Sequence, residues 1–218
     1  MALNILTIAS SPLGERSVTR KLTDKVVRSL QAAYPDSRLV TRDLASEPLP
    51  HIDGLFVASN FTRPDERNEA FQAAIAASDK AVDELIAADV IVIGAPMYNF
   101  GIPSSLKAWI DHVVRMGRTF GGGASGPEGL LLNKKVIVVS ARGHVYTEGP
   151  YTTWDHQEPQ LRTALGFMGL TNVSVIRAEG LQRGAEASEA AFKIADEQIV
   201  DAINSVHELD SAKSSLAS

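Results

Sequence analysis

The sequence predicts a doubly wound α/β fold, in which helices cover both faces of a five-stranded parallel sheet. Five apolar runs rich in β-branched residues alternate with segments of helical spacing along the chain. The strongest runs are uniformly apolar, as strands buried on both faces require. A length of 218 residues also suits one large domain.

The predicted strands are the short apolar runs. Four of them are strong and the second along the chain is weaker; in order they cover residues 5–9, 38–41, 90–94, 136–140 and 173–176. Alternation with helices favours right-handed crossovers and a parallel arrangement. At this chain length we expect the flavodoxin-like strand order 2-1-3-4-5.

The predicted helices carry apolar residues on one stripe. They cover residues 22–33, 71–86, 106–114, 157–168 and 191–206. No repeat and no linker rich in Pro, Gly or Ser divides the chain. We therefore expect a single domain over residues 1–207, followed by a small, polar and disordered tail over residues 208–218.

Composition excludes several classes of function. The net charge is −5 with both signs interleaved, so no basic patch is available for nucleic acid. Cysteine is absent, which rules out disulfides and thiolate metal sites, and we expect no metal. No apolar run approaches the roughly 20 residues of a membrane-spanning helix, and the start lacks a signal peptide. The expected location is the cytoplasm.

The turn after the first strand is crowded with hydroxyl groups. In doubly wound folds ligands bind beyond the carboxyl ends of the strands, where this turn lies. Ser11, Ser17 and Thr19 stand at the predicted N-terminus of a helix, whose unpaired N–H groups favour a phosphate. The alternative is that Ser17 or Thr19 only caps the helix. A nucleoside triphosphate is disfavoured because the chain has no P-loop motif.

The turn after the central strand, residues 95–103, has the parts that a flat conjugated ring requires. Met97, Tyr98 and Phe100 can pack on the ring, and Asn99 can meet its polar edge. Aromatic residues that merely close the core would explain Tyr98 or Phe100 singly, but not the whole turn.

A third turn follows the fourth predicted strand and contains Arg142 and His144. If the flat ring is that of a flavin, its reduced form carries negative charge near N1 and O2, and a cation or hydrogen-bond donors in this turn would stabilise that charge. The alternative is a solvated loop arginine. Residues 121–126 spell G-x-G-x-x-G, but they follow a helix, so we predict a flexible loop instead of a dinucleotide fingerprint.

Together these turns resemble the FMN-dependent NADH-azoreductase family of homodimeric, flavodoxin-like flavoenzymes. The likeness is carried by the hydroxyl-rich first turn, the Met-Tyr-Asn-Phe run and the segments 126–130 and 142–143. It implies tightly but non-covalently bound FMN. The residues implied to bind it are Ser11, Ser17, Val18 and Thr19 at the phosphate, Met97, Tyr98, Asn99 and Phe100 at the ring, and Ala141, Arg142, Gly143 and His144 at the pyrimidine edge.

The same resemblance places FMN near a homodimer interface, with Phe120 and Phe167 lining the acceptor pocket. Plain core packing is the alternative for Phe167. The chain departs from the family in having Ala141-Arg142-Gly143-His144 where Ser-Arg-Gly-Gly is usual, and a Gly-rich stretch after Phe120 where relatives often have a tyrosine. The first of these departures brings a titratable side chain near the flavin. Since solvent can deliver the protons, no residue is assigned as an obligatory acid or base, and His144 is the candidate to test.

The implied activity is ping-pong hydride transfer from NADH or NADPH through the flavin to a quinone or an azo compound. The residues leave the choice of nicotinamide and the natural acceptor open. The main alternative is a flavodoxin-type electron carrier without turnover of small molecules. A phosphoryl-accepting receiver domain is a weaker alternative, because it needs acidic residues where this chain has Ala9-Ser10-Ser11.

Overall fold

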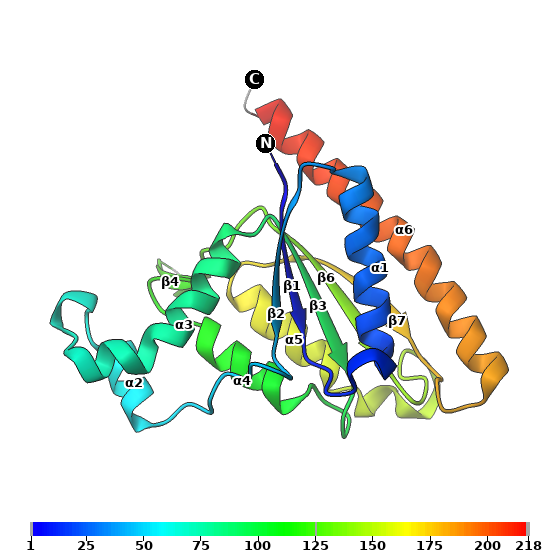
Figure 1. Cartoon of the computed structure of the whole chain (residues 1–218), viewed down its shortest axis with the longest axis horizontal. Coiled ribbons are helices and arrows are strands. Elements are labelled where there is room, and N and C mark those ends of the chain that lie inside the picture. Colours follow the sequence, from blue (N-terminus) through cyan, green and yellow to red (C-terminus); the bar gives the residue numbers. More distant parts are fainter. Residues whose placement is uncertain (1, 125, 217–218) are drawn as a thin grey trace.

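The computed structural model describes residues 2–124 and 126–216 of the chain, with side chains of the last helix described up to residue 208. Its centre is a five-stranded parallel sheet in the order β2-β1-β3-β6-β7 (Figure 1). These strands are β1 (Asn4–Ala9), β2 (Arg38–Asp43), β3 (Val90–Pro96), β6 (Lys135–Ala141) and β7 (Asn172–Ala178). The predicted strands and their order are confirmed.

Five helices occupy the segments that the apolar spacing predicted. They are α1 (Val18–Ala33), α3 (Glu69–Ala87), α4 (Ser104–Val113), α5 (Gln157–Phe167) and α6 (Ala185–Leu216). The last of them is helical through most of the predicted tail, while residues 217–218 lie outside the described residues. The disorder of that tail and the domain boundary at residue 207 therefore stay predictions.

Alternation along the strands builds one hydrophobic cluster on each face of the sheet. Ile8 and Ile93 pack in the cluster that includes residues of α3, α4 and α5. Ile5 and Val92 pack in the other, beneath α1 and α6, which lie side by side (Figure 1). β1, β3, β6 and β7 thus contribute to both clusters, which is why their sequences are largely apolar, whereas the edge strand β2 contributes to neither.

Four short helical elements and a hairpin complete the described chain. They are α2 (Gly54–Phe61), the 3₁₀ turns η1 (Gly14–Arg16), η2 (Pro64–Glu66) and η3 (Gly149–Trp154), and the antiparallel strands β4 (Phe120–Gly123) and β5 (Gly126–Gly129). The prediction of a flexible loop over residues 121–126 is wrong, since these glycines pair across the hairpin; Ser125 lies outside the described residues. Periodicity cannot detect such a short, glycine-rich strand pair.

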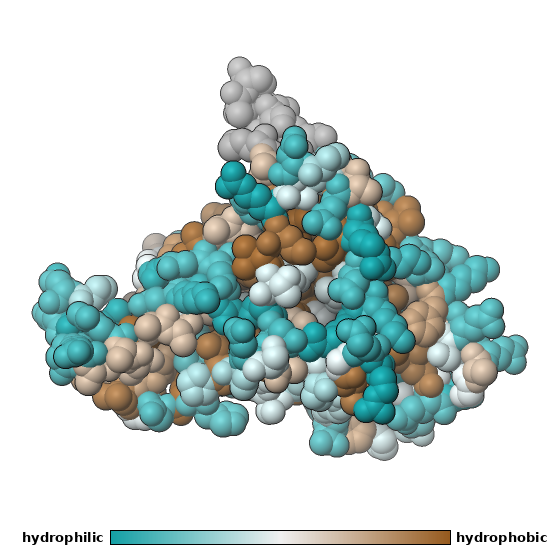
Figure 2. Space-filling model, viewed as in Figure 1, coloured by the Kyte–Doolittle hydropathy of each residue, from teal (hydrophilic) through white to brown (hydrophobic). Residues whose placement is uncertain are grey.

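The edge strand β2 leaves apolar side chains at the surface. Leu39 and Val40 are 41% and 46% exposed, and Figure 2 shows an apolar area over this part of the sheet. In the described part of the chain, no helix combines the length and the apolar character needed to cross a membrane.

The switch point of the sheet lies at its carboxyl edge between β1 and β3. Both the backbone N–H and the hydroxyl of Ser10 donate to the carbonyl of Gly94, at 3.3 and 2.7 Å, as the chain leaves β1. Here the connections run to opposite sides of the sheet, and such switch points form crevices for ligands.

Candidate functional site

Three turns meet at the carboxyl edge of the sheet. We call residues 10–19, which include the start of α1, the first turn, residues 97–103 the second turn and residues 141–146 the third turn. The first is tied to β3 through Ser10, and the N–H of Met97 in the second donates to the carbonyl of Ala141 in the third at 3.0 Å. The structure thus brings together the three segments that the sequence singled out.

The first turn can accept an anion at the start of α1. Ser11, Ser17 and Thr19 are each 1% exposed, and the hydroxyls of Ser17 and Thr19 lie 3.0 Å apart. The Ser17 hydroxyl accepts from the N–H of Arg20 at 3.2 Å, so Ser17 does cap α1. Among the described residues, the N–H groups of Val18 and Thr19 meet no acceptor. They remain free for a phosphate, so the cap does not compete with that role.

Arg20, which sequence analysis missed, holds the first turn in place. Its guanidinium donates to the carbonyl of Ser11 at 2.9 and 3.2 Å and to the carboxylate of Asp43 at 2.6 Å. This hydrogen bond from Arg20 is the main cause that lowers the pKa of Asp43 below its ordinary value. A charged residue in a helix's first turn gives no sign of such contacts in the sequence.

Replacing Arg20 with glutamine should destabilise the protein in a pH-dependent way. Since the folded pKa of Asp43 lies below the ordinary value of 3.8, the stabilisation is complete above pH 3.8 and is lost as the pH falls through the folded value. The difference in urea-unfolding free energy between wild type and variant should therefore shrink in acid. The control is Lys25→Gln, since Lys25 also lies in α1 but forms an exposed ion pair, with Asp196. A difference for Arg20→Gln that is independent of pH would contradict this.

The second turn presents its aromatic residues outward. Tyr98 and Gly101 exchange backbone hydrogen bonds of 3.1 and 3.0 Å around Asn99 and Phe100, whose φ angles are 48° and 69°. A bulky residue such as Phe100 rarely adopts this left-handed conformation. Tyr98 and Phe100 are 39% and 43% exposed, so neither closes the core.

The arginine of the third turn, Arg142, is buried. Arg142 is 1% exposed, and its guanidinium donates to Gln157 at 2.9 Å and to Glu179 at 3.0 Å and pairs with Asp155 at 3.0 Å. It is therefore neither a solvated loop residue nor free to meet a ligand as an open cation. It supports the turn from beneath, while the N–H groups of Gly143 and His144, which meet no acceptor among the described residues, are available as donors.

A row of aromatic rings, also missed by sequence analysis, joins the second and third turns. Trp154 of η3 packs edge-on against Phe100, with the ring centroids 5.6 Å apart, and its ring is tilted against that of Tyr151 at 5.1 Å. Tyr151 in turn lies 5.6 Å from the exposed ring of His144. The only indication of this row in the sequence is the pair of aromatic residues Tyr151 and Trp154 in an otherwise polar stretch before α5.

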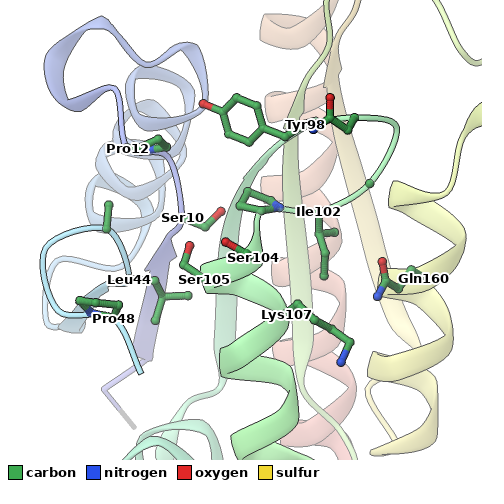
Figure 3. A pocket seen from close by; sticks show the side chains of 14 residues that line it. Ser10, Pro12, Leu44, Pro48, Tyr98, Ile102, Ser104, Ser105, Lys107 and Gln160 are labelled. Atoms are coloured by element: carbon green, nitrogen blue, oxygen red, sulfur yellow. The ribbon is translucent and has the colours of Figure 1, made fainter. Parts of the chain in front are cut away.

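A groove of about 760 Å³ opens between the first and second turns. Its lining includes Ser10, Pro12, Tyr98 and Ile102 from these turns and Gln160 from α5 (Figure 3). Ligand pockets usually measure about 300–1,000 Å³. The groove is thus large enough for part of a cofactor or a small substrate.

Phe120 and Phe167 pack together, but at the other end of the sheet. Their ring centroids are 4.7 Å apart, and Phe167 is 41% exposed, so it is not a core residue. The next residue, Met168, accepts from the N–H of Leu131 at 2.9 Å, shortly before β6 begins. Within one chain the pair therefore lies near the amino ends of the strands, away from the three turns.

Comparison with known proteins gives consistent results. A family model described as a flavodoxin-like fold matches residues 3–203. The chain is 46% identical over 202 residues to an FMN-dependent NADH:quinone oxidoreductase 2 of Trichormus variabilis, covering 92% of this chain and 98% of that protein. It is 50% identical over 189 residues to an FMN-dependent NADH:quinone oxidoreductase of Herminiimonas arsenicoxydans, covering 86% and 92% of the two chains.

Solved structures agree with this likeness. An azoreductase from Bacillus anthracis superimposes with a TM-score of 0.83 at 28% identity, covering 95% of this chain and all of that one. An FMN-dependent NADH-azoreductase from the same species, solved in complex with FMN, superimposes with a TM-score of 0.81 at 23% identity, which supports the shared fold.

Proposed function

We propose that this chain is an FMN-dependent NADH:quinone oxidoreductase that also reduces azo compounds. The chain belongs to the flavodoxin-like family, whose model matches residues 3–203. The observation that carries the proposal is the meeting of the three turns at one crevice. The alternative of an electron carrier has no support, because the relatives compared above are all named as reductases or oxidoreductases.

The residues of the first turn fit the phosphate of FMN. The free N–H groups of Val18 and Thr19 point from the start of a 16-residue helix, whose dipole favours an anion. The hydroxyls of Ser11, Ser17 and Thr19 add donors that are shielded from water, where hydrogen bonds to an anion are strongest. No cation is needed in this arrangement.

The second and third turns fit the flat ring system. We assign Met97, Tyr98, Asn99 and Phe100 to the face of the ring, and Ala141 to His144, through their backbone, to its pyrimidine edge. When bound there, FMN would supply the redox chemistry, which is hydride transfer between NADH and the acceptor. The protein orients the partners and keeps water out of the contact between them.

Proton delivery does not require a buried acid in this site. His144 is exposed beside Tyr151 and is the one titratable side chain of the third turn that solvent reaches freely near the proposed ring edge. We keep it as the candidate proton donor. Its conversion to asparagine should change the pH profile of flavin reduction if it has that role.

A homodimer accounts for Phe120 and Phe167. Since the pair lies away from the turns of its own chain, it can line the acceptor pocket only of a second copy. Their partial exposure is consistent with that position. The homodimer, the pocket role of this pair and the expected cytoplasmic location are parts of the proposal.

Purification without added flavin tests the proposed function. We expect a protein with the yellow colour and visible spectrum of bound FMN, whose absorbance is bleached by NADH and restored by a quinone such as menadione. Steady NADH oxidation with menadione would distinguish an oxidoreductase from a carrier. Colourless protein that takes up no FMN would overturn the proposal.

The phosphate assignment predicts a loss of affinity for FMN when Ser17 becomes alanine. A net hydrogen bond contributes about 0.5–1.5 kcal/mol, so the dissociation constant should rise several-fold. Flavin fluorescence during titration of apoprotein measures it. Asn68→Ala removes a comparable cap from α3 and controls for lost helix stability. Equal affinities in the two variants would leave Ser17 with its capping role alone.

A further inference from the structure

We propose that Gln157 is a positioning residue that fixes the second turn relative to the third and thereby sets the shape of the flavin site. The inference rests on the proposed function. It concerns a residue that stands at the start of α5 and belongs to none of the three turns.

The side chain of Gln157 joins the bases of two turns. It is fully buried, at 0% exposure. Its Nε2 donates to the carbonyl of Ala95 at 2.9 Å, two residues before the second turn. Its Oε1 accepts from Nε of Arg142 at 2.9 Å, inside the third turn. One amide thus connects the ends of β3 and β6 from the helical layer above them.

Only an amide satisfies both partners of Gln157. The Ala95 carbonyl needs a donor and the Arg142 guanidinium needs an acceptor, and an amide offers one of each. A carboxylate would keep the contact with Arg142 and lose the donor to Ala95. An apolar side chain would offer neither group, so the buried Nε of Arg142 would lose its acceptor and the Ala95 carbonyl its side-chain donor, and such losses in a buried site are costly.

The ionic network behind Gln157 carries no net charge. It contains three arginines and three carboxylates, namely Arg142, Arg162, Arg177, Asp155, Glu158 and Glu179. Burial alone would raise the pKa of Glu158, but hydrogen bonds from Arg177 and Arg162 hold it below its ordinary value. All three carboxylates are therefore paired, and the network locates the third turn without adding a positive charge beside the flavin.

The residues just before Gln157 hold the tip of the second turn. The N–H of His156 donates to the carbonyl of Phe100 at 3.0 Å, and Trp154 packs against the Phe100 ring. A strained residue such as Phe100 persists only where its surroundings hold it. The segment 154–157 thus contacts the second turn at its base, near Ala95, and at its tip, at Phe100. It also binds the third turn through Arg142.

Two substitutions test the role of Gln157. In Gln157→Met, which loses both contacts, the dissociation constant of FMN from apoprotein should rise by roughly tenfold, the equivalent of one to two net hydrogen bonds. In Gln157→Glu, which adds a buried negative charge near the flavin, the reduction potential of bound FMN should fall further than in the methionine variant. In both, KM for NADH should change, because the site is misshapen. In Gln157→Met, which adds no charge, KM should change more than kcat.

Gln198→Met is the matched control. Gln198, in α6, accepts from the N–H of Arg177 at 2.7 Å, so its loss also removes a partly buried glutamine contact at the sheet but touches neither turn. Its FMN affinity and flavin potential should equal those of wild type. If Gln157→Met does not fold, the FMN affinity and the KM for NADH of Gln157→Glu decide, because that variant also loses the donor to Ala95.

The outcomes separate the two proposals. Wild-type protein that binds no FMN overturns the proposed function. Wild-type protein that binds FMN and oxidises NADH, together with Gln157 variants whose FMN affinity, potential and KM match those of the Gln198 control, overturns the positioning role and leaves the function intact.

Discussion

Replacing Arg142 with methionine should lower the free energy of unfolding by roughly 3–5 kcal/mol, the usual cost of removing one partner from a buried ion pair. The guanidinium is buried and lies at 3.0 Å from both Asp155 and Glu179, which are themselves only 12% and 10% exposed. Without it, these carboxylates face each other in a site that water scarcely reaches. Urea unfolding, followed by circular dichroism, measures the loss.

The ion pair between Arg162 and Glu158 provides the control for this prediction. Arg162 binds a carboxylate of the same network at 2.8 Å, but its side chain is 46% exposed. Exposed pairs contribute about 0–1 kcal/mol, so Arg162→Met should be nearly neutral. Adding Glu179→Gln to Arg142→Met should restore part of the stability, because it removes one uncompensated charge. Equal losses for the two single arginine variants would contradict the buried role of Arg142.

Substitution of Gly129 with alanine should displace the β4–β5 hairpin from the end of α5. A Cβ atom at this position would lie 2.0 Å from the backbone nitrogen of Gly169, where no side chain can move aside. The backbones must separate, which strains the hydrogen bond from Leu131 to Met168 and the ring contact between Phe120 and Phe167. Overpacking of this kind costs about 1–3 kcal/mol, measurable by urea unfolding.

Kinetics would connect the same substitution to the acceptor pocket. If the two phenylalanines line the pocket of a second copy, Gly129→Ala should raise KM for a quinone and leave FMN content unchanged. Gly122→Ala is the control, since a Cβ atom at Gly122 of the same hairpin meets nothing within 4 Å. If Gly129→Ala and Gly122→Ala were equally stable, the close approach of Gly129 to Gly169 would not contribute to the packing of the hairpin.

Much of the fold could be predicted because its signals are local. Runs such as Val90–Pro96 are apolar at every position, as strands between two helical layers must be. Once the strands are known, parallel connections bring their carboxyl ends to one edge, so the three turns were found together. Short elements escaped: α2 has only eight residues, and the hairpin is built largely from glycine.

The site was predicted less completely because its supports come from distant parts of the chain. Arg20 meets Asp43 across 23 positions, and Arg142 meets Glu179 across 37. Nothing in the local pattern of either arginine distinguishes a buried, paired cation from a solvated one. Phe120 and Phe167 were predicted to line the acceptor pocket, which stays a prediction, and their position far from the turns of the same chain appears only in three dimensions.

The sequence by itself determined the sheet, its order and the three turns that line the crevice, since hydrophobic periodicity and chain connectivity are encoded residue by residue. Only the tertiary structure decided how those turns are held: the Arg142 side chain lies inward against carboxylates, Phe100 lies outward on a strained turn, and Gln157 of α5 connects the ends of two strands. The physical reason is that burial and pairing of polar groups depend on neighbours contributed by other segments, and these neighbours exist only once the chain has folded.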